Sequence, residues 1–155
     1  METLIGTTLQ VKVGEEKPTT SFKPQYWAFY FGAHWAPPCR KFTTDLKTFY
    51  EKVNEDCPEN EKNLEVIFIS LDGNEEHFNR NFGLMPWFAL PYADEARVSA
   101  LKVKYDITAL PTLIVVNSTG EKTVSNEGRQ YVLSNDTIDE VLIKWKAEVD
   151  KVASN

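Results

Sequence analysis

Hydrophobic residues along the chain form short runs, and the spacing within each run predicts a strand or a helix. Residues 9–13, Leu-Gln-Val-Lys-Val, alternate apolar and polar side chains, which is typical of a strand with one face in water. We expect this strand at the edge of a sheet. The runs 26–31 and 64–70 are continuous and rich in aromatic or β-branched residues, so they are expected to be buried central strands. Residues 113–116 predict a further strand, and residues 122–125 are expected to return antiparallel to it.

Four other segments place apolar residues at helical spacing. They run from Pro38 to Asp56, from 75 to 82, from 94 to 105, and beyond the N-cap candidates at 134–136, where the stripe is Ile138, Val141, Leu142, Trp145 and Val149. Residues 85–91 contain two prolines and are expected to be irregular. Strands that alternate with helices and end in a hairpin predict an α/β fold, with a mostly parallel sheet and helices on both faces.

Size and composition limit the classes of protein that this chain can represent. A length of 155 residues predicts a single domain over residues 1–155. The net charge of −6 disfavours binding to nucleic acid or to an anionic membrane. The first residues lack the basic and apolar segments of a signal peptide, so we expect a cytoplasmic or nuclear protein. The acidic run 59–65 is expected to be solvated surface.

Cysteine and histidine are too sparse to indicate a metal site. Cys39 and Cys57 lie eighteen positions apart, which matches neither a disulfide framework nor a zinc motif, and Cys57 is interpreted as incidental. His34 and His77 have no cysteine or carboxylate at a metal-ligand spacing. The sequence therefore predicts no metal and no cofactor.

The candidate site follows the first buried strand, because ligands of α/β sheets gather beyond the carboxyl ends of strands. The residues there are Trp35-Ala36-Pro37-Pro38-Cys39-Arg40. Positions 36 and 39 are neighbours at the start of a helix, close enough for a disulfide to bridge them. A thiol at position 36 would face the positive end of the helix, which lowers its pKa from about 8.5 toward 7. Position 36, however, holds alanine.

The segment Trp27–Phe42 resembles the active-site strand and helix start of the tryparedoxin and nucleoredoxin branch of thioredoxin-like proteins. In that branch the motif is Trp-Cys-Pro-Pro-Cys-Arg. Three further blocks agree, at residues 85–92, 94–97 and 110–113, and the resemblance extends over residues 25–135. It implies a thioredoxin fold, in which helices flank a central mixed β-sheet on both faces. It leaves open which of the two subfamilies is nearer.

The resemblance implies a dithiol–disulfide oxidoreductase that acts as a protein-disulfide reductase. The first motif cysteine attacks a substrate disulfide, and the second resolves the mixed disulfide. Cys39 matches the resolving cysteine, whereas Ala36 stands at the position of the attacking cysteine. The chain as written is therefore expected to be inactive in dithiol exchange. Either Ala36 replaces a cysteine of an active parent, or the chain is a natural redox-inactive relative.

The resemblance also implies a substrate groove beside the motif. Pro111 matches the proline that this fold holds in the cis form, and the backbone of Leu110 is expected to pair with an extended substrate. The remaining residues expected to line the groove are Trp35, Pro37, Trp87 and Arg129. The implied partners are disulfide-containing proteins and a dithiol or reductase electron donor, and the protein is expected to be a monomer. The competing hypothesis is a non-catalytic binding module that uses the groove of Trp35, Trp87 and Pro111.

Overall fold

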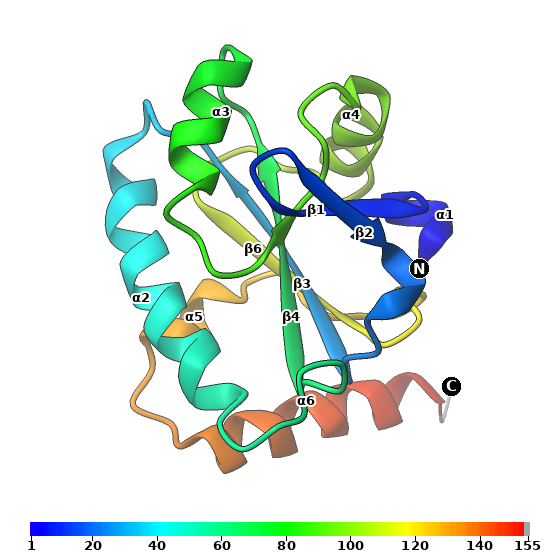
Figure 1. Ribbon diagram of the computed structural model, residues 1–155. Helices are drawn as coiled ribbons and strands as arrows, with labels where there is room; N and C mark the ends of the chain where they lie inside the picture. Colours follow the sequence, from blue (N-terminus) through cyan, green and yellow to red (C-terminus); the bar gives the residue numbers. More distant parts are fainter. Residues whose placement is uncertain (154–155) are drawn as a thin grey trace.

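The computed structural model describes residues 1–153, and seven strands in it form one mixed sheet in the order β2-β1-β5-β4-β3-β6-β7 (Figure 1). The strands are β1 (Thr8–Lys12), β2 (Glu15–Pro18), β3 (Tyr26–Gly32), β4 (Leu64–Ser70), β5 (Phe88–Ala89), β6 (Thr112–Asn117) and β7 (Thr123–Ser125). Every residue of β3 and β4 is buried, as expected for central strands. The thioredoxin-like architecture with a mixed sheet is thus confirmed.

The expectation of a mostly parallel sheet is wrong. Strand β4 runs parallel to β3 and β5, whereas β6 is antiparallel to β3. The hairpin β1–β2 joins β5 in an antiparallel sense, and β7 is antiparallel to β6. The sheet is mixed because an antiparallel pair of strands lies on each side of the parallel strands β3, β4 and β5: the pair β1–β2 on one side and the pair β6–β7 on the other. Strand β1 is not at the edge of the sheet, because β2 pairs with its outer side. Residues 85–91, which we expect to be irregular, contribute the short strand β5.

Helices cover both faces of the sheet, as predicted. They are α1 (Glu2–Ile5), α2 (Pro37–Val53), α3 (Glu75–Phe82), α4 (Glu95–Lys104), α5 (Arg129–Leu133) and α6 (Ile138–Ala153), with a 3₁₀ turn at Thr19–Ser21. One core contains Leu46 of α2, Phe78 of α3 and Trp145 of α6. The other contains Ile5 of α1 and Leu101 of α4. Helices α2 and α4 thereby stand on opposite faces of the sheet (Figure 1).

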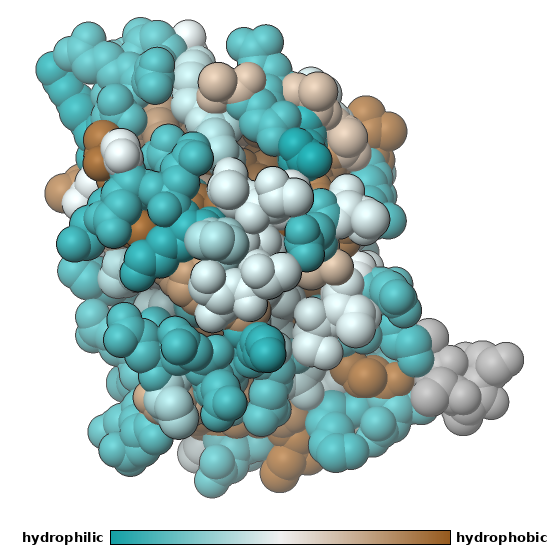
Figure 2. Space-filling model, turned by 45° about the vertical axis from the view of Figure 1, so that its right-hand side comes forward, coloured by the Kyte–Doolittle hydropathy of each residue, from teal (hydrophilic) through white to brown (hydrophobic). Residues whose placement is uncertain are grey.

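The surface offers little apolar area on the side turned forward in Figure 2. Hydrophobic colour there occurs as small separate areas among hydrophilic residues, without a broad apolar face. Among residues 1–153, no helix has the length and apolar character needed to cross a lipid bilayer. Most of the hydrophobic side chains described lie in the two cores between the sheet and its helices.

Candidate functional site

The start of α2 brings positions 36 and 39 together, as the spacing predicts. Strand β3 ends at Gly32, and Ala36 is the N-cap residue of α2. Pro37 and Pro38 fill the first two helical positions, where a missing N–H costs nothing. The backbone N–H of Cys39 donates to the carbonyl oxygen of Ala36 at 2.9 Å. Ala36 is 7 % exposed, Cys39 is 2 % exposed, and Pro37 lies on the surface.

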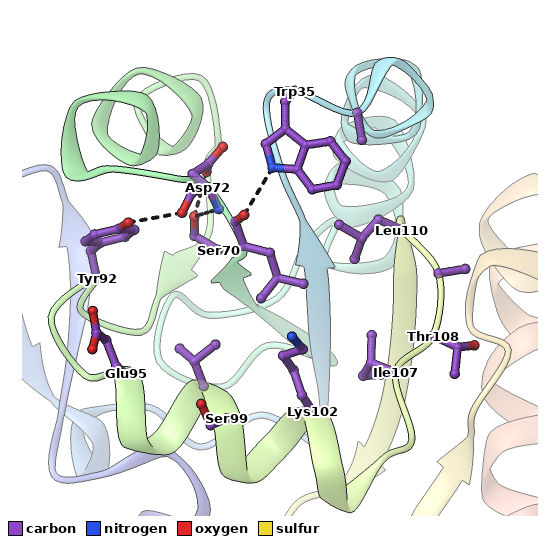
Figure 3. Close-up of a pocket in the computed structure, with 14 residues that line it drawn as sticks. Trp35, Ser70, Asp72, Tyr92, Glu95, Ser99, Lys102, Ile107, Thr108 and Leu110 are labelled. Carbon is purple, nitrogen blue, oxygen red and sulfur yellow. Dashed lines mark hydrogen bonds between the residues drawn. The ribbon is translucent and has the colours of Figure 1, made fainter.

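The loop that precedes α2 is hydrogen-bonded to the residues that follow β4. The backbone N–H of His34 donates to Oδ1 of Asp72 at 2.7 Å, and Nε1 of Trp35 donates to the carbonyl oxygen of Leu71 at 3.1 Å. The hydroxyl of Ser70 donates to the other carboxylate oxygen of Asp72 at 2.5 Å (Figure 3). Asp72 is buried, and both of its carboxylate oxygens accept hydrogen bonds. None of these bonds involves the side chain at position 36.

A groove of about 710 Å³ lies beside this loop (Figure 3). Trp35 and Ala36 line it on one side and Leu110 at its end, while α4 lines the opposite side. The Leu110–Pro111 bond is cis, as the resemblance implies. Pro111 lines a second hollow of about 350 Å³, which shares Ala109 with the groove. The structure therefore places the motif and the cis-proline loop side by side.

Arg129 lies close to the cis-proline loop. Its guanidinium donates from Nη1 to the carbonyl oxygen of Pro111 at 3.2 Å and lies 5.6 Å from the ring centre of Phe42. Helix α5 can come this close to β6 because a glycine precedes it: a Cβ at Gly128 would lie 2.8 Å from the carbonyl oxygen of Leu113. Arg129 thus supports the loop and lines the second hollow, not the groove beside Ala36.

Trp87, like Arg129 and Pro37, does not line the groove beside Ala36. Trp87 is fully buried and packs edge-on against Tyr30 and Tyr50 in the core beneath α2. It cannot line a groove, so the prediction for Trp87 is wrong, because the large ring fills core space where the chain enters β5. Trp35 behaves as expected, since it is 63 % exposed and lines the groove.

Cys39 lies in an environment that opposes ionisation. Burial raises the pKa of its thiol, while a hydrogen bond from the Ala33 backbone and the positive charge of Arg129 act in the opposite direction. The hydroxyl of Tyr30 donates to the carbonyl oxygen of Cys39 at 3.0 Å and lies 2.7 Å from Oγ1 of Thr43. Burial also raises the pKa of Tyr30. Burial therefore shields the thiol of Cys39 from solvent and favours its neutral form.

We expect an alkylating reagent to distinguish the two cysteines of the native protein. Cys57 is partly exposed on a loop, whereas Cys39 is buried and has a raised thiol pKa. Iodoacetamide at pH 8 should label Cys57 at least about tenfold faster than Cys39, because the thiolate is the reactive form. Peptide mass spectrometry after timed quenching measures both rates. Equal rates would contradict the buried position of Cys39, and both thiols should react alike in 6 M guanidinium chloride.

The fold also brings the two histidines together. The ring centres of His34 and His77 are 6.2 Å apart, although 42 residues separate them in the chain. Within the described part of the chain, no group of three or more histidine, cysteine and acidic residues is arranged to hold a metal ion. The pair borders the loop before α2 without forming a metal-ligand set.

The comparison with known families agrees with the geometry of the motif and the cis-proline loop. A family model described as thioredoxin-like matches residues 24–122, which include β3, the start of α2 and β6. The chain belongs to the thioredoxin-like family of oxidoreductases. The resemblance to this family seen in the sequence is therefore confirmed.

Two curated relatives represent the two subfamilies. Nucleoredoxin of Mus musculus is 42 % identical over 123 residues, which cover 79 % of this chain and 27 % of that protein. Tryparedoxin of Trypanosoma brucei brucei is 40 % identical over 106 residues, which cover 68 % of this chain and 70 % of that protein. The chain thus spans about a quarter of the length of the nucleoredoxin but most of the tryparedoxin.

Solved structures show the same likeness in three dimensions. Tryparedoxin II from C. fasciculata superposes with a TM-score of 0.75 at 32 % identity, covering 83 % of this chain and 86 % of that one. A structure of tryparedoxin II complexed with glutathionylspermidine gives a TM-score of 0.73 at 30 % identity, with the same coverage. The likeness extends well beyond the motif, to most of the fold.

Proposed function

We propose that this chain is a protein-disulfide reductase domain whose attacking cysteine is replaced by Ala36, so that it is inactive in dithiol exchange. The observation that carries the proposal is the position of Ala36, which caps α2 one turn before the buried Cys39 and lines the groove. Every other part of the site is retained: the two prolines, the cis-proline loop and the exposed Trp35. Only the first sulfur is absent.

The proposed reaction of a chain with sulfur at position 36 has two steps. The thiolate at position 36 attacks one sulfur of a substrate disulfide; a mixed disulfide forms, and the other substrate sulfur leaves as a thiolate. The thiolate of Cys39 then attacks the sulfur at position 36, which releases the second substrate thiol and leaves a disulfide between positions 36 and 39. A dithiol donor reduces that disulfide and is itself oxidised. With Ala36, the first bond cannot form.

We propose disulfide-containing proteins as substrates and a small dithiol or a reductase as the electron donor. The complex of tryparedoxin II with glutathionylspermidine supports a thiol-bearing peptide conjugate as one donor class. We also propose that residues 1–155 act as one monomeric domain in the cytoplasm or nucleus. The net charge of −6 supports a partner other than nucleic acid or an anionic membrane.

Restoring the sulfur tests the catalytic proposal. Ala36→Cys should reduce insulin in the presence of a dithiol donor, while the chain with Ala36 should not exceed the uncatalysed rate. Failure of Ala36→Cys, with its fold intact by circular dichroism, would count against an oxidoreductase site at position 36. The test needs no knowledge of the physiological substrate, because reductases of this chemistry act on model disulfides.

A second candidate function is binding without turnover, and the exposure of Trp35 favours it. A tryptophan that is 63 % exposed beside a groove offers a large apolar contact surface for a partner. Trp35→Ala should weaken retention of a disulfide-containing peptide by the chain with Ala36, whereas Val103→Ala, at an exposed position outside the groove residues, should not. Equal retention by the two variants would exclude the groove as the binding surface.

A further inference from the structure

Helix α4 presents two oppositely charged side chains along the groove. Glu95 and Lys102 both line it and are both exposed. They lie seven residues apart, which corresponds to about 10.5 Å along a helix. In Figure 3 the carboxylate of Glu95 points toward Tyr92, and the side chain of Lys102 extends upward toward the side of the groove that carries Trp35. The two charges thus mark opposite ends of one wall.

These charges have no ionic partners in the described part of the chain. The ion pairs found there join other residues, even though α4 includes Arg97, which pairs with Asp94. Tyr92 lines the groove at the end where Glu95 lies, and its hydroxyl donates to the backbone carbonyl oxygen of Asp72 at 3.0 Å (Figure 3). The Glu95 end of the α4 wall is therefore negative, and the Lys102 end is positive. The lining of the groove also includes the apolar residues Val98, Ile107 and Leu110.

We propose that the groove selects an extended peptide that carries a basic side chain at the Glu95 end and an acidic side chain at the Lys102 end. An extended chain rises about 3.3 Å per residue and points successive side chains to opposite sides, so side chains two residues apart lie about 6.6 Å apart on the same side, and the long arms of lysine and glutamate span the rest of the distance to the two charges. The single peptide residue between them points to the opposite side of the groove, which carries Trp35 and position 36. This inference rests on the proposed function, because the same groove is where position 36 would meet a substrate disulfide, and it adds the charge order of that substrate.

The test compares two capped peptides of identical composition and opposite charge order. Each carries lysine and glutamate two residues apart, on either side of an S-methylcysteine that cannot exchange with Cys39. Binding to the chain with Ala36 is followed by the fluorescence of Trp35, because Trp27, Trp87 and Trp145 are buried. At low ionic strength one order should bind about three- to tenfold more tightly than the other, as expected for two exposed ion pairs. The difference should shrink in 0.5 M salt.

Exchanging the two charges should reverse the preference. The double variant Glu95→Lys/Lys102→Glu keeps the net charge and should bind the other peptide order more tightly. The variant Glu95→Gln/Lys102→Gln, which is gentler on α4, should bind both orders equally. The matched control is Glu51→Lys/Lys47→Glu, which exchanges exposed charges on α2 outside the groove and should keep the parent preference.

Several results would overturn the inference. They are equal binding of both peptides to the parent chain, absence of binding to the parent chain, or an unchanged preference in the exchanged variant. None of these measurements requires turnover, so they are separate from the test of Ala36→Cys. An active Ala36→Cys chain without a charge-order preference would leave the reductase proposal standing and remove this one.

Discussion

Ala36→Cys is expected to raise the rate of insulin reduction at least about tenfold above that of the parent chain. The new thiol would stand at the N-cap of α2, where the helix dipole favours the thiolate. With a pKa near 7, about half of the thiol is ionised at neutral pH, against about 3 % for an ordinary cysteine with a pKa near 8.5. Turbidity of insulin with dithiothreitol as donor measures the rate.

Two variants separate the roles of the sulfurs in that experiment. Ala36→Ser has nearly the size of cysteine but no sulfur, and it should remain inactive. Ala36→Cys combined with Cys39→Ser should form a stable mixed disulfide with a substrate, because the resolving thiol is absent. Activity of the Ala36→Ser chain, or turnover by the double variant equal to that of Ala36→Cys, would contradict the assigned roles.

Glu65→Gln is expected to stabilise the folded protein at pH 8 by about 1–3 kcal/mol. Glu65 is 1 % exposed, and it accepts a hydrogen bond of 2.6 Å from the Tyr50 hydroxyl. Lys62 is its nearest cation, at 4.0 Å from Oε1. Burial raises the pKa of Glu65 from 4.5 to about 7, so an ionised Glu65 destabilises the fold. Glutamine keeps the acceptor for Tyr50 and removes the charge.

The pH dependence of that effect has a definite sign. Between pH 4.5 and about 7 the folded protein holds a proton on Glu65 that the unfolded chain has lost, so stability falls as the pH rises through this window. Urea unfolding from pH 4 to 8 should show the parent and Glu65→Gln chains converging at low pH, diverging between pH 4.5 and about 7, and keeping a constant difference above that window. Glu51→Gln, at an exposed site on α2, should follow the parent. A variant less stable than the parent at pH 8 would contradict the argument.

The burial of Glu65 is not predicted by the pattern of charged and apolar residues around it. The acidic run 59–65 reads as solvated surface, yet its last residue is the second residue of a strand that is buried along its whole length. The β-branched residues predict the strand, but the burial of the strand depends on α2, whose Tyr50 packs over it. In the same way, β5 and α5 are too short to show periodicity, since they have only two and five residues. Long periodic elements such as α2 and α6 were predictable, because each must bury an apolar stripe.

The residues of the candidate site also differ in how far the sequence predicts their positions. Local spacing was enough to join positions 36 and 39, and the family resemblance supplied the cis Pro111. The sequence did not reveal the role of Asp72 in holding the loop before α2, because that role depends on contacts across the sheet edge. Asp72 directly follows the buried strand β4, so its place at the carboxyl edge beside β3 was a usable signal. Trp87 was misplaced because a block that matches a family motif need not face the ligand.

The hydrogen bonds from the loop before α2 to Asp72 and Leu71 hold this loop independently of the side chain at position 36. They fix His34 and Trp35 through a backbone N–H and an indole N–H, so the loop keeps its shape whichever small residue occupies position 36. On the proposed function, an exchange between alanine and cysteine at position 36 therefore removes or restores redox chemistry while the scaffold around it keeps its hydrogen bonds.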